Sequence, residues 1–464
     1  MAVDFWALDH SSNRLAVLDA DGRRFTYAQL RDGCDHIAPF LPSSRKTFGF
    51  VLCRNTSECL IAYLSALRSG SAVCLMEAGL QPEIFEEQTA TYEPDWVFAM
   101  EQMDITGYSR QAVPGGFVYY RQAGPSVTVI NPELAVLLPT SGSTGSSKLV
   151  KLTYRNLQAN AASIITYLGI TAEDRCITAL PMPYSYGLSV LNTHLLAGGQ
   201  LAMTAGSVAQ REFWTFFREH RPTSLSGVPY HYEIMLRSGL LDSDFPGLKT
   251  LTQAGGRLSP ERIEQVAKIA DRRGWRFFVM YGQTEATARI AYLPPERLRD
   301  KIGSIGVAIP GGALSLDPET GELLYSGPNV MLGYAQSRAD LSKGDEVNGQ
   351  LRTGDLARMD EEGYFYITGR LKRFLKIFGR RFGLDEMESL ISHRLGQVVA
   401  CFGKDDQLSV AIERESSEQV VLHVLKETLK IHPSAFRIQR YDALPRMANG
   451  KIDYNTLARQ EQAP

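Results

Sequence analysis

Apolar residues along this chain form short continuous runs that alternate with stretches of helical spacing. The runs at 48–52, 72–76 and 134–138 are almost entirely apolar, as in strands buried on both faces of a parallel sheet. Residues 58–67, between the first two runs, repeat apolar positions at helical intervals and end at a Ser-Gly pair. Because strands that alternate with helices of this length pair in parallel, the pattern predicts an α/β fold.

Two later segments share another pattern, in which a strand runs directly into glycine. They are 250–256 and 276–282. Ligands of open α/β sheets bind at such carboxyl ends of strands. The glycines at these ends are therefore candidate site residues: Gly255, Gly256 and Gly282. Beyond residue 310 the sequence changes to short strands and turns, which predicts a small β-rich subdomain.

A chain of 464 residues is longer than one hydrophobic core usually organises. We assign residues 1–369 to a large N-terminal domain of parallel and mixed sheets with helices, including the β-rich part. Residues 370–373 are expected to form a hinge, and 374–464 a small mobile α+β lid domain. The stretch 366–381 contains six basic residues and no acid. A solvated face or a weak nucleic-acid patch is the ordinary explanation, but interleaved apolar residues favour a structured connector.

The charge balance narrows the functional classes. Charged residues make up 22% of the chain and the formal net charge is −2, so no overall attraction to nucleic acid or to an anionic membrane follows. The six cysteines lack CxxC spacing, which favours reduced core residues over a disulfide frame or a zinc site. The chain has no basic leader and no run of about 18 apolar residues. We expect a cytoplasmic protein without a membrane span or a nucleic-acid partner.

The stretch from Pro139 to Lys148 has the composition of a phosphate-binding loop. Glycine lets the backbone approach a polyphosphate, hydroxyl and N–H groups donate to its oxygens, and lysine adds a positive charge. The stretch is not a Walker loop, because Ser147 stands where GxxxxGK[ST] requires glycine. A flexible surface loop is the alternative. The candidate nucleotide-binding residues here are Thr140, Ser141, Gly142, Ser143, Thr144, Gly145 and Lys148.

Four further motifs follow this loop in order. They are YGQTE at 281–285, RTGD at 352–355, GR at 369–370 and PRMANGK at 445–451. Together with the loop, the set resembles the adenylate-forming superfamily, which comprises acyl- and aryl-CoA synthetases, adenylation domains of nonribosomal peptide synthesis and luciferases. The resemblance covers nearly the whole chain.

The resemblance implies a role for the middle motifs in activating a carboxylic acid with ATP. Glu285 would bind Mg²⁺, Thr284 would contact the α-phosphate and Tyr281 would pack on adenine. By itself, a Thr-Glu pair at a helix start is more often a cap. Asp355, assisted by Arg370, would accept hydrogen bonds from the ribose hydroxyls, where a local turn cap is the alternative. Gly255 and Gly256 complete the expected nucleotide site.

Lys451 is the last candidate of the set. An isolated lysine after a flexible turn near the chain end is ordinarily a solvated residue. In the matching family motif, however, this lysine enters the site and stabilises charge between the carboxylate and the α-phosphate. The resemblance therefore implies that Lys451, Thr284 and Glu285 are the catalytic residues.

The sequence departs from the family pattern in two places. Many members have aspartate in GRxD, whereas this chain has Lys372 there, so Lys372 is the hinge candidate. Near residue 184, amino-acid-activating members carry an aspartate for the substrate ammonium, and this chain has no acid. A buried ammonium without a carboxylate partner is costly, so an α-amino acid substrate is disfavoured. The expected substrate-pocket residues are Tyr184, Tyr186, Gly187 and Gly282.

These observations predict an ATP- and Mg²⁺-dependent ligase that converts a small carboxylic acid to an acyl- or aryl-adenylate and passes the acyl group to a thiol. Coenzyme A is the first choice of thiol. The phosphopantetheinyl group of an acyl carrier protein is the alternative. A second alternative is a nucleotide-binding regulator without turnover, which the presence of Lys451 disfavours.

Overall fold

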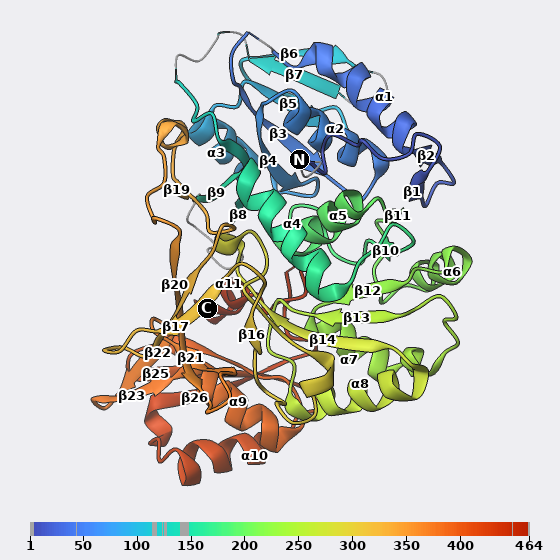
Figure 1. Ribbon diagram of the computed structural model, residues 1–464. Coiled ribbons are helices and arrows are strands. Elements are labelled where there is room, and N and C mark those ends of the chain that lie inside the picture. Colours follow the sequence, from blue (N-terminus) through green and yellow to red (C-terminus); the bar gives the residue numbers. More distant parts are fainter. Residues whose placement is uncertain are drawn as a thin grey trace.

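The computed structural model describes residues 4–42, 44–113, 118–122, 124, 128–139, 148–447 and 449–462. The predicted phosphate-loop residues Thr140, Ser141, Gly142, Ser143, Thr144 and Gly145 lie outside the described residues. In the described ranges, two large sheets with helices are followed by a smaller sheet and a C-terminal body (Figure 1). The predicted α/β class is confirmed.

An eight-stranded sheet carries the strand that leads toward the predicted phosphate loop. Its inner strands β3, β4, β5 and β8 pair in parallel, as their apolar runs predict, and the outer strands pair antiparallel. In spatial order the strands are β19 (Gly333–Ala335), β9 (Leu149–Thr153), β8 (Leu134–Pro139), β4 (Ala72–Glu77), β3 (Phe48–Cys53), β5 (Trp96–Ala99), β7 (Val118–Gln122) and β6 (Tyr108–Ala112). The helices of this region are α1 (Tyr27–Ile37), α2 (Ser57–Arg68) and α3 (Pro82–Tyr92).

A nine-stranded sheet contains both predicted strands that run into glycine. The spatial order is β16 (Val307–Ala308), β15 (Ala291–Leu293), β14 (Arg276–Tyr281), β13 (Thr250–Gln253), β12 (Ser224–Gly227), β10 (Arg175–Ile177), β11 (Gln200–Met203), β1 (Leu15–Asp19) and β2 (Arg24–Thr26). From β14 to β1 neighbouring strands are parallel. Helices α6 (Arg211–His220), α7 (Pro229–Arg237) and α8 (Pro260–Arg273) share a hydrophobic core with β12, β13 and β14.

Two helices, α4 (Tyr154–Leu168) and α5 (Ser185–Ala197), lie between the two sheets (Figure 1). Leu191 of α5 shares one core with Val73 of the eight-stranded sheet and Leu201 of the nine-stranded sheet. The side chain of Thr153 accepts a hydrogen bond from the Asn156 N–H and closes a capping box at the start of α4. The hydroxyl of Thr153 therefore caps the start of α4.

Helix α5 begins at Ser185, directly after a loop that contains Pro181 and Pro183. Gly187 lies in its first turn, where a Cβ atom would come within 2.2 Å of the Pro181 carbonyl oxygen. The glycine therefore allows the helix to approach the preceding loop closely and does not end it.

The β-rich part after residue 310 is confirmed as a four-stranded antiparallel sheet. Its strands are β17 (Ala313–Leu316), β18 (Glu322–Ser326), β20 (Gln350–Met359) and β21 (Phe365–Arg370). Strand β20 carries the RTGD motif and β21 ends at Arg370, so two of the predicted motifs lie on paired strands. No helix of the described ranges is long and apolar enough to cross a membrane. The six cysteines are buried and unpaired, as predicted.

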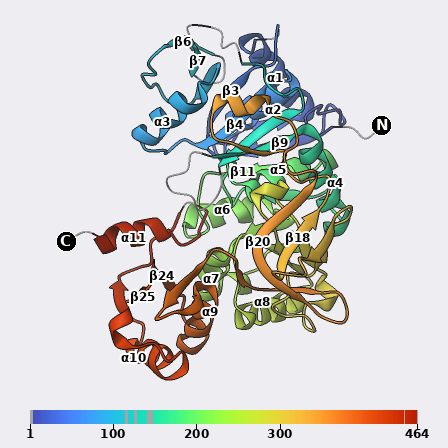
Figure 2. The same ribbon diagram turned by 90° about the vertical axis from the view of Figure 1, so that its left-hand side faces the viewer.

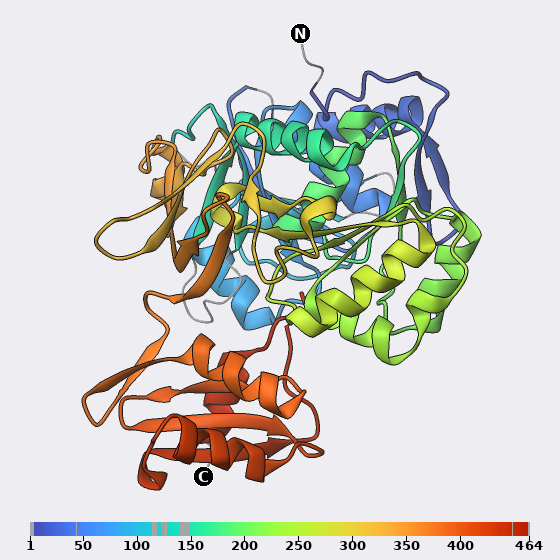
Figure 3. The same ribbon diagram turned by 60° about the horizontal axis from the view of Figure 1, so that its bottom comes forward.

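The C-terminal segments form a separate body joined to the rest by a narrow connection (Figures 2 and 3). They are β22 (Phe374–Ile377), β23 (Arg380–Gly383), α9 (Leu384–Leu395), β24 (Ala400–Lys404), β25 (Gln407–Glu413), α10 (Glu418–His423), β26 (Phe436–Tyr441) and α11 (Tyr454–Gln462). Cys401 of β24 faces the core with α9 and α10, whereas its neighbour Phe402 faces α11. The body therefore has helices on both faces of its sheet and a hydrophobic core of its own.

A buried ion pair joins distant parts of the large region. Arg338, in the 3₁₀ turn Arg338–Ser342, donates to the two carboxylate oxygens of Asp95 at 3.0 and 2.9 Å. Both side chains are only 5% exposed. Asp95 also accepts hydrogen bonds from the Phe48 N–H at 2.9 Å and from Arg45 at 2.8 Å. The pair thus ties the β-rich part of the chain to the start of β5.

We expect Arg338→Met to lower stability strongly, because it leaves the buried Asp95 carboxylate without its main partner. Removing one member of a buried ion pair costs about 3–5 kcal/mol. The matched control is Arg299→Met, which breaks an exposed pair with Asp271 and should cost at most about 1 kcal/mol. Thermal unfolding midpoints measure the difference, and equal midpoints for the two variants would contradict it.

Candidate active site

Lys451, from the C-terminal body, reaches the carboxyl end of the nine-stranded sheet. Its Nζ lies 5.9 Å from the centre of the Tyr184 ring. Burial, together with the nearby charge of Arg370, lowers the pKa of Lys451 to about 8, against the opposing charges of Glu285 and Asp355. The fold thus brings five of the sequence-predicted site residues, from five separate segments, close to one another.

A tight turn positions Lys451 against the large region. The Met447 N–H donates to the Lys451 carbonyl at 2.8 Å, and the Lys451 N–H donates to Asn449 Oδ1 at 3.1 Å. The guanidinium of Arg446 lies 4.5 Å over the ring of Tyr230, in the first turn of α7. The turn is therefore closed by its own hydrogen bonds and contacts the helix beside the site.

Asp355 is the centre of a hydrogen-bond network. It is 4% exposed and accepts hydrogen bonds from the Tyr281 hydroxyl at 2.5 Å, from Gln283 Nε2 at 3.1 Å and from Arg370 Nε at 3.1 Å. Gln283 Nε2 also donates to the Thr353 carbonyl at 2.9 Å. Burial and the Asp355 charge raise the pKa of Tyr281 well above its usual range, so the phenol remains a donor. Packing of Tyr281 on adenine stays a prediction.

Glu285 and Lys148 both contact Tyr334, a residue that lies outside the motifs. The Tyr334 hydroxyl donates to Glu285 Oε1 at 2.8 Å, and Lys148 Nζ lies 3.9 Å from the centre of the Tyr334 ring. Tyr334 belongs to β19, which pairs with β9 directly after Lys148. Burial and the Glu285 charge raise the pKa of Tyr334, which keeps its hydroxyl protonated.

The predicted glycines lie where side chains approach the strand ends. Gly255 follows β13 with φ +83°, and a Cβ there would stand 2.3 Å from the Tyr184 hydroxyl oxygen. Glycine is the residue that this conformation and this approach require. Gly256 lies against Pro229, and Gly282 lies against the backbone carbonyl that follows the YGQTE turn.

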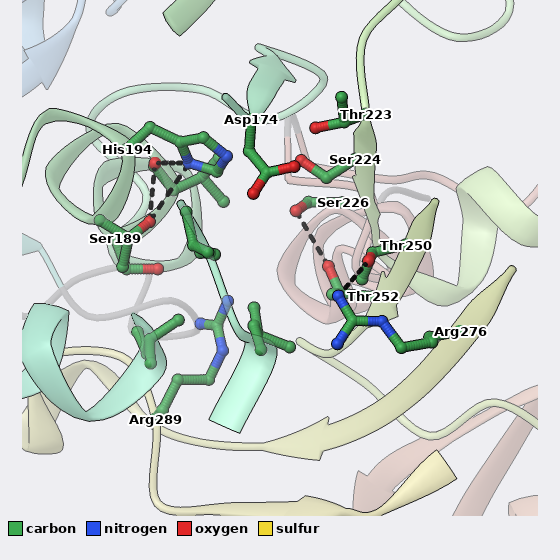
Figure 4. Close-up of a pocket in the computed structure, with 15 residues that line it drawn as sticks. Asp174, Ser189, His194, Thr223, Ser224, Ser226, Thr250, Thr252, Arg276 and Arg289 are labelled. Atoms are coloured by element: carbon green, nitrogen blue, oxygen red, sulfur yellow. Dashed lines mark hydrogen bonds between the residues drawn. The ribbon is translucent and has the colours of Figure 1, made fainter. Parts of the chain in front are cut away.

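The first turn of α5 connects the motif residues with a cavity. Ser185 Oγ lies 3.2 Å from Thr284 Oγ1. The adjacent Tyr186 donates its hydroxyl to the Thr252 carbonyl at 3.0 Å, and Arg289 Cζ lies 3.9 Å over its ring. The cavity beyond is lined by α4, α5, β12 and β13 (Figure 4). Tyr184, Tyr186 and Gly187 precede the part of α5 that lines this cavity, and their role in a substrate pocket stays a prediction.

Lys372 lies between two anchored arginines. On one side Arg370 pairs with Asp355 of the β-rich sheet. On the other, Arg373 donates to Glu388 Oε1 of α9 at 2.6 Å and also pairs with Asp385. Lys372 itself is exposed. The two arginines belong to different bodies, and the short piece of chain between them is the connection seen in Figure 3.

Three contributors to the site were missed by sequence reasoning. Gln283 lies inside the YGQTE motif, so its proximity to the site could have been inferred, though its amide contact with Asp355 could not. Tyr334 and Arg289 lie outside all the motifs, in positions that only strand pairing and helix packing define.

Comparison with known proteins places the chain in a family. Residues 4–335 match the family model of the AMP-binding enzymes, so the chain belongs to the AMP-binding enzyme family. The resemblance noted in the motifs is confirmed.

Individual relatives agree with this assignment. The chain is 27% identical over 477 residues to an indoleacetate–CoA ligase of Aromatoleum aromaticum, with 93% of this chain and 92% of the relative covered. It is 28% identical over 404 residues to a 2-succinylbenzoate–CoA ligase of Bacillus velezensis, covering 83% and 77%. The fold is similar to that of an o-succinylbenzoate–CoA synthetase from Bacillus subtilis solved with its acyl-adenylate, with a TM-score of 0.77, 20% identity and coverage of 99% and 98%.

We expect kcat/KM for adenylate formation to fall as the pH rises through about 8, because Lys451 then loses the positive charge that its role requires. In Lys451→Arg this alkaline decline should disappear, since a guanidinium stays charged. Lys451→Ala should lose about 10²–10³ in rate at neutral pH. Pyrophosphate release measured from pH 6 to 10 checks all three, and the same alkaline decline in the arginine variant would exclude Lys451 as its source.

Proposed function

We propose that this protein joins a small carboxylic acid to coenzyme A through an acyl- or aryl-adenylate, at the expense of ATP. The observation that carries the proposal is the delivery of Lys451 from the C-terminal turn to the point where Glu285, Asp355 and Arg370 converge. Lys451 is partly buried there, beside charges of both signs. Its chemistry suits a reaction in which negative charge develops at that place.

The reaction has two steps. In the first, a carboxylate oxygen of the acid attacks the α-phosphorus of ATP, the bond to the bridging oxygen of the β-phosphate breaks, and pyrophosphate leaves with the electron pair. In the second, the thiol sulfur attacks the acyl carbon, the thiol proton is released, and AMP departs as the carbon–oxygen bond breaks. Lys451 and Thr284 would donate to the oxygens that gain charge in the first step. Asp355 and Arg370 would hold the ribose, and Tyr281 would pack on adenine.

Glu285 fits a Mg²⁺ ion as one carboxylate ligand. Among the residues that the structure describes, no three His, Cys, Asp or Glu side chains come together as a metal-binding group. Mg²⁺ commonly binds through one or two carboxylates, with substrate phosphates and water as further ligands. Tyr334 orients the Glu285 carboxylate by its hydrogen bond. When bound, Mg²⁺ supplies charge compensation for the phosphates.

The names of the relatives favour coenzyme A as the acceptor, since both are CoA ligases. An acyl carrier protein with its phosphopantetheine remains the alternative acceptor, and it uses the same thiol chemistry. A regulator without turnover would not need a lysine placed among the site charges. We place the enzyme in the cytoplasm, where ATP and coenzyme A are available.

The separate hydrophobic core after residue 374 supports a division into a domain of residues 1–369, a hinge at 370–373 and a lid of 374–464. The lid would deliver Lys451 for the first step in the orientation in which its Nζ lies 5.9 Å from the centre of the Tyr184 ring. The second step needs a path for the thiol, so we propose that the lid rotates about Lys372 between the two steps.

The proposal is tested by mixing the protein with ATP, Mg²⁺ and a panel of acids that includes indoleacetate and 2-succinylbenzoate. We expect pyrophosphate release with at least one acid, and a thioester, detected by mass spectrometry, after coenzyme A is added. Thioester with a carrier protein alone would favour the alternative acceptor.

Glu285→Gln should raise the Mg²⁺ concentration needed for activity, because an amide offers oxygen without charge. Superimposable Mg²⁺ titrations of the variant and the wild type would remove Glu285 from the metal site.

We expect Lys372→Pro to impair thioester formation more than adenylate formation. Proline fixes φ near −65° and restricts the preceding residue, so leaving the orientation that already holds Lys451 becomes harder. Lys372→Ala is the control, because it removes the side chain without restricting the backbone. Single-turnover adenylate and thioester yields are compared, and equal losses in the proline variant would point to misfolding instead of a stiffened hinge.

A further inference from the structure

Arg289 is a buried arginine without an acidic partner. Its relative exposure is 2%, and in the described ranges no carboxylate oxygen lies within ion-pair distance of its guanidinium. Its Nε is buried and makes no hydrogen bond among the described residues. The contrast is Arg338, which is similarly buried but donates to both oxygens of Asp95. Since an unpaired buried charge is costly, the position of Arg289 requires an explanation.

The groups around Arg289 do not neutralise it. Its guanidinium lies over the face of Tyr186 and interacts with the hydroxyl of Tyr167, both of which are uncharged because their pKa values are raised by burial. Asp174 lines the same cavity, but its oxygens accept from the Thr171 N–H at 2.8 Å and pair with Lys249 at 3.6 Å. A cation–π contact and a neutral hydroxyl leave the positive charge of Arg289 available.

Arg289 points into the cavity between α5 and the strands β12 and β13 (Figure 4). Ser189 and His194 face it from the helix, and Ser226 and Thr252 face it from the strands. The cavity has room of about 30 Å³, enough for about two water molecules. Its lining combines hydroxyl groups on both sides of one guanidinium with the apolar side chains of Ile164, Leu168, Ile170 and Val190.

His194 does not compete for an anion. Its Nδ1 lies 2.8 Å from the Val190 carbonyl, so Nδ1 carries the proton and Nε2 is a buried acceptor without a partner in the described ranges. Burial lowers the pKa of His194, which keeps the ring neutral. Arg289 is thus the positive group that faces this cavity from its inner side; Arg276, at the rim, donates to Thr250.

The cavity adjoins the reacting end of the site through one turn of α5. Ser185 contacts Thr284, and the guanidinium of Arg289 lies over the ring of the next residue, Tyr186. Tyr184 precedes this turn, and the Nζ of Lys451 lies over its ring. An acid whose reacting carboxylate lies near Thr284 and Lys451 therefore has its other end directed toward Arg289.

The geometry points to a dicarboxylic acid as the substrate, with the second carboxylate paired to Arg289. The inference rests on the proposed function, because it needs an acid bound with one carboxylate at Lys451. The planar guanidinium supplies donors in the arrangement that a carboxylate accepts, and the Ser226 hydroxyl, which accepts from Thr252 Oγ1, keeps its own proton for a further hydrogen bond in the cavity. A monocarboxylic acid would leave Arg289 buried and unpaired.

The test compares dicarboxylic acids with their monoamides, which have nearly the same shape and lack the second charge. The panel runs from malonate to suberate and includes the phthalate isomers and 2-succinylbenzoate. For the wild-type enzyme we expect kcat/KM of pyrophosphate release to favour at least one dicarboxylate over its monoamide by about 10²-fold or more, because a site built for a charged group rejects an analogue without it. Equal kcat/KM for both members of every pair overturns the inference and leaves the cavity as a water site.

Variants separate this inference from the proposed function. Arg289→Met should remove the preference, mainly by raising KM for the dicarboxylate, while the monoamide changes only a few-fold. Arg289→Lys should keep part of it. The matched control is Arg358→Met, because Arg358 also stacks on a tyrosine, 4.1 Å from the Tyr366 ring, but lies outside the cavity; it should keep the full preference. An unchanged preference in Arg289→Met overturns the inference, whereas no pyrophosphate release by the wild type with any acid overturns the proposed function and the inference with it.

Discussion

The buried carboxylate of Asp355 is the interaction on which the arrangement of this site depends. It accepts hydrogen bonds from Tyr281 and Gln283, which follow the central strand β14, and from Arg370, which ends β21. A carboxylate that is 4% exposed is stable only if its oxygens accept hydrogen bonds. These three donors therefore stabilise the charge of Asp355, and the carboxylate in turn fixes the positions of their side chains. The nine-stranded sheet, the β-rich sheet and the connector to the lid are thereby joined at one point, and the negative charge left there helps to keep Lys451 protonated.

The proposed hinge lies between two arginines that are held by acidic partners. Arg370 is anchored to Asp355 on one side, and Arg373 is anchored to Glu388 and Asp385 on the other. Ion pairs that are partly buried resist movement more than exposed ones. The exposed Lys372 between them is free of such anchoring, so its backbone torsions are the ones that can change at least cost. Arg370 and Arg373 of the connector thus have acidic partners, which explains these two charges without a nucleic-acid ligand.

One buried charge near the site has no acidic partner among the described residues. Most buried charges here are paired, as Arg338 is with Asp95 and Lys151 with Glu346. Arg289 departs from this rule within the same cavity that adjoins the site. In a fold that pairs most of its buried charges, an unpaired buried arginine is tolerated where a bound ligand supplies the missing negative charge.

The sequence by itself determined the α/β class, the apolar runs that form inner parallel strands and the two strands that run into glycine, whereas the residues near Lys451 were indicated by the resemblance of the motifs to a known family. The first group of features depends on local rules, because apolar periodicity and glycine at strand ends act within a few residues of each other. Tertiary structure alone decided the rest. Tyr334 reaches Glu285 because β19 pairs with β9, and Arg289 reaches Tyr186 because α5 lies between the two sheets. Neither contact has a local signal, because strand pairing and helix packing bring together residues whose separation along the chain carries no information about their distance in space.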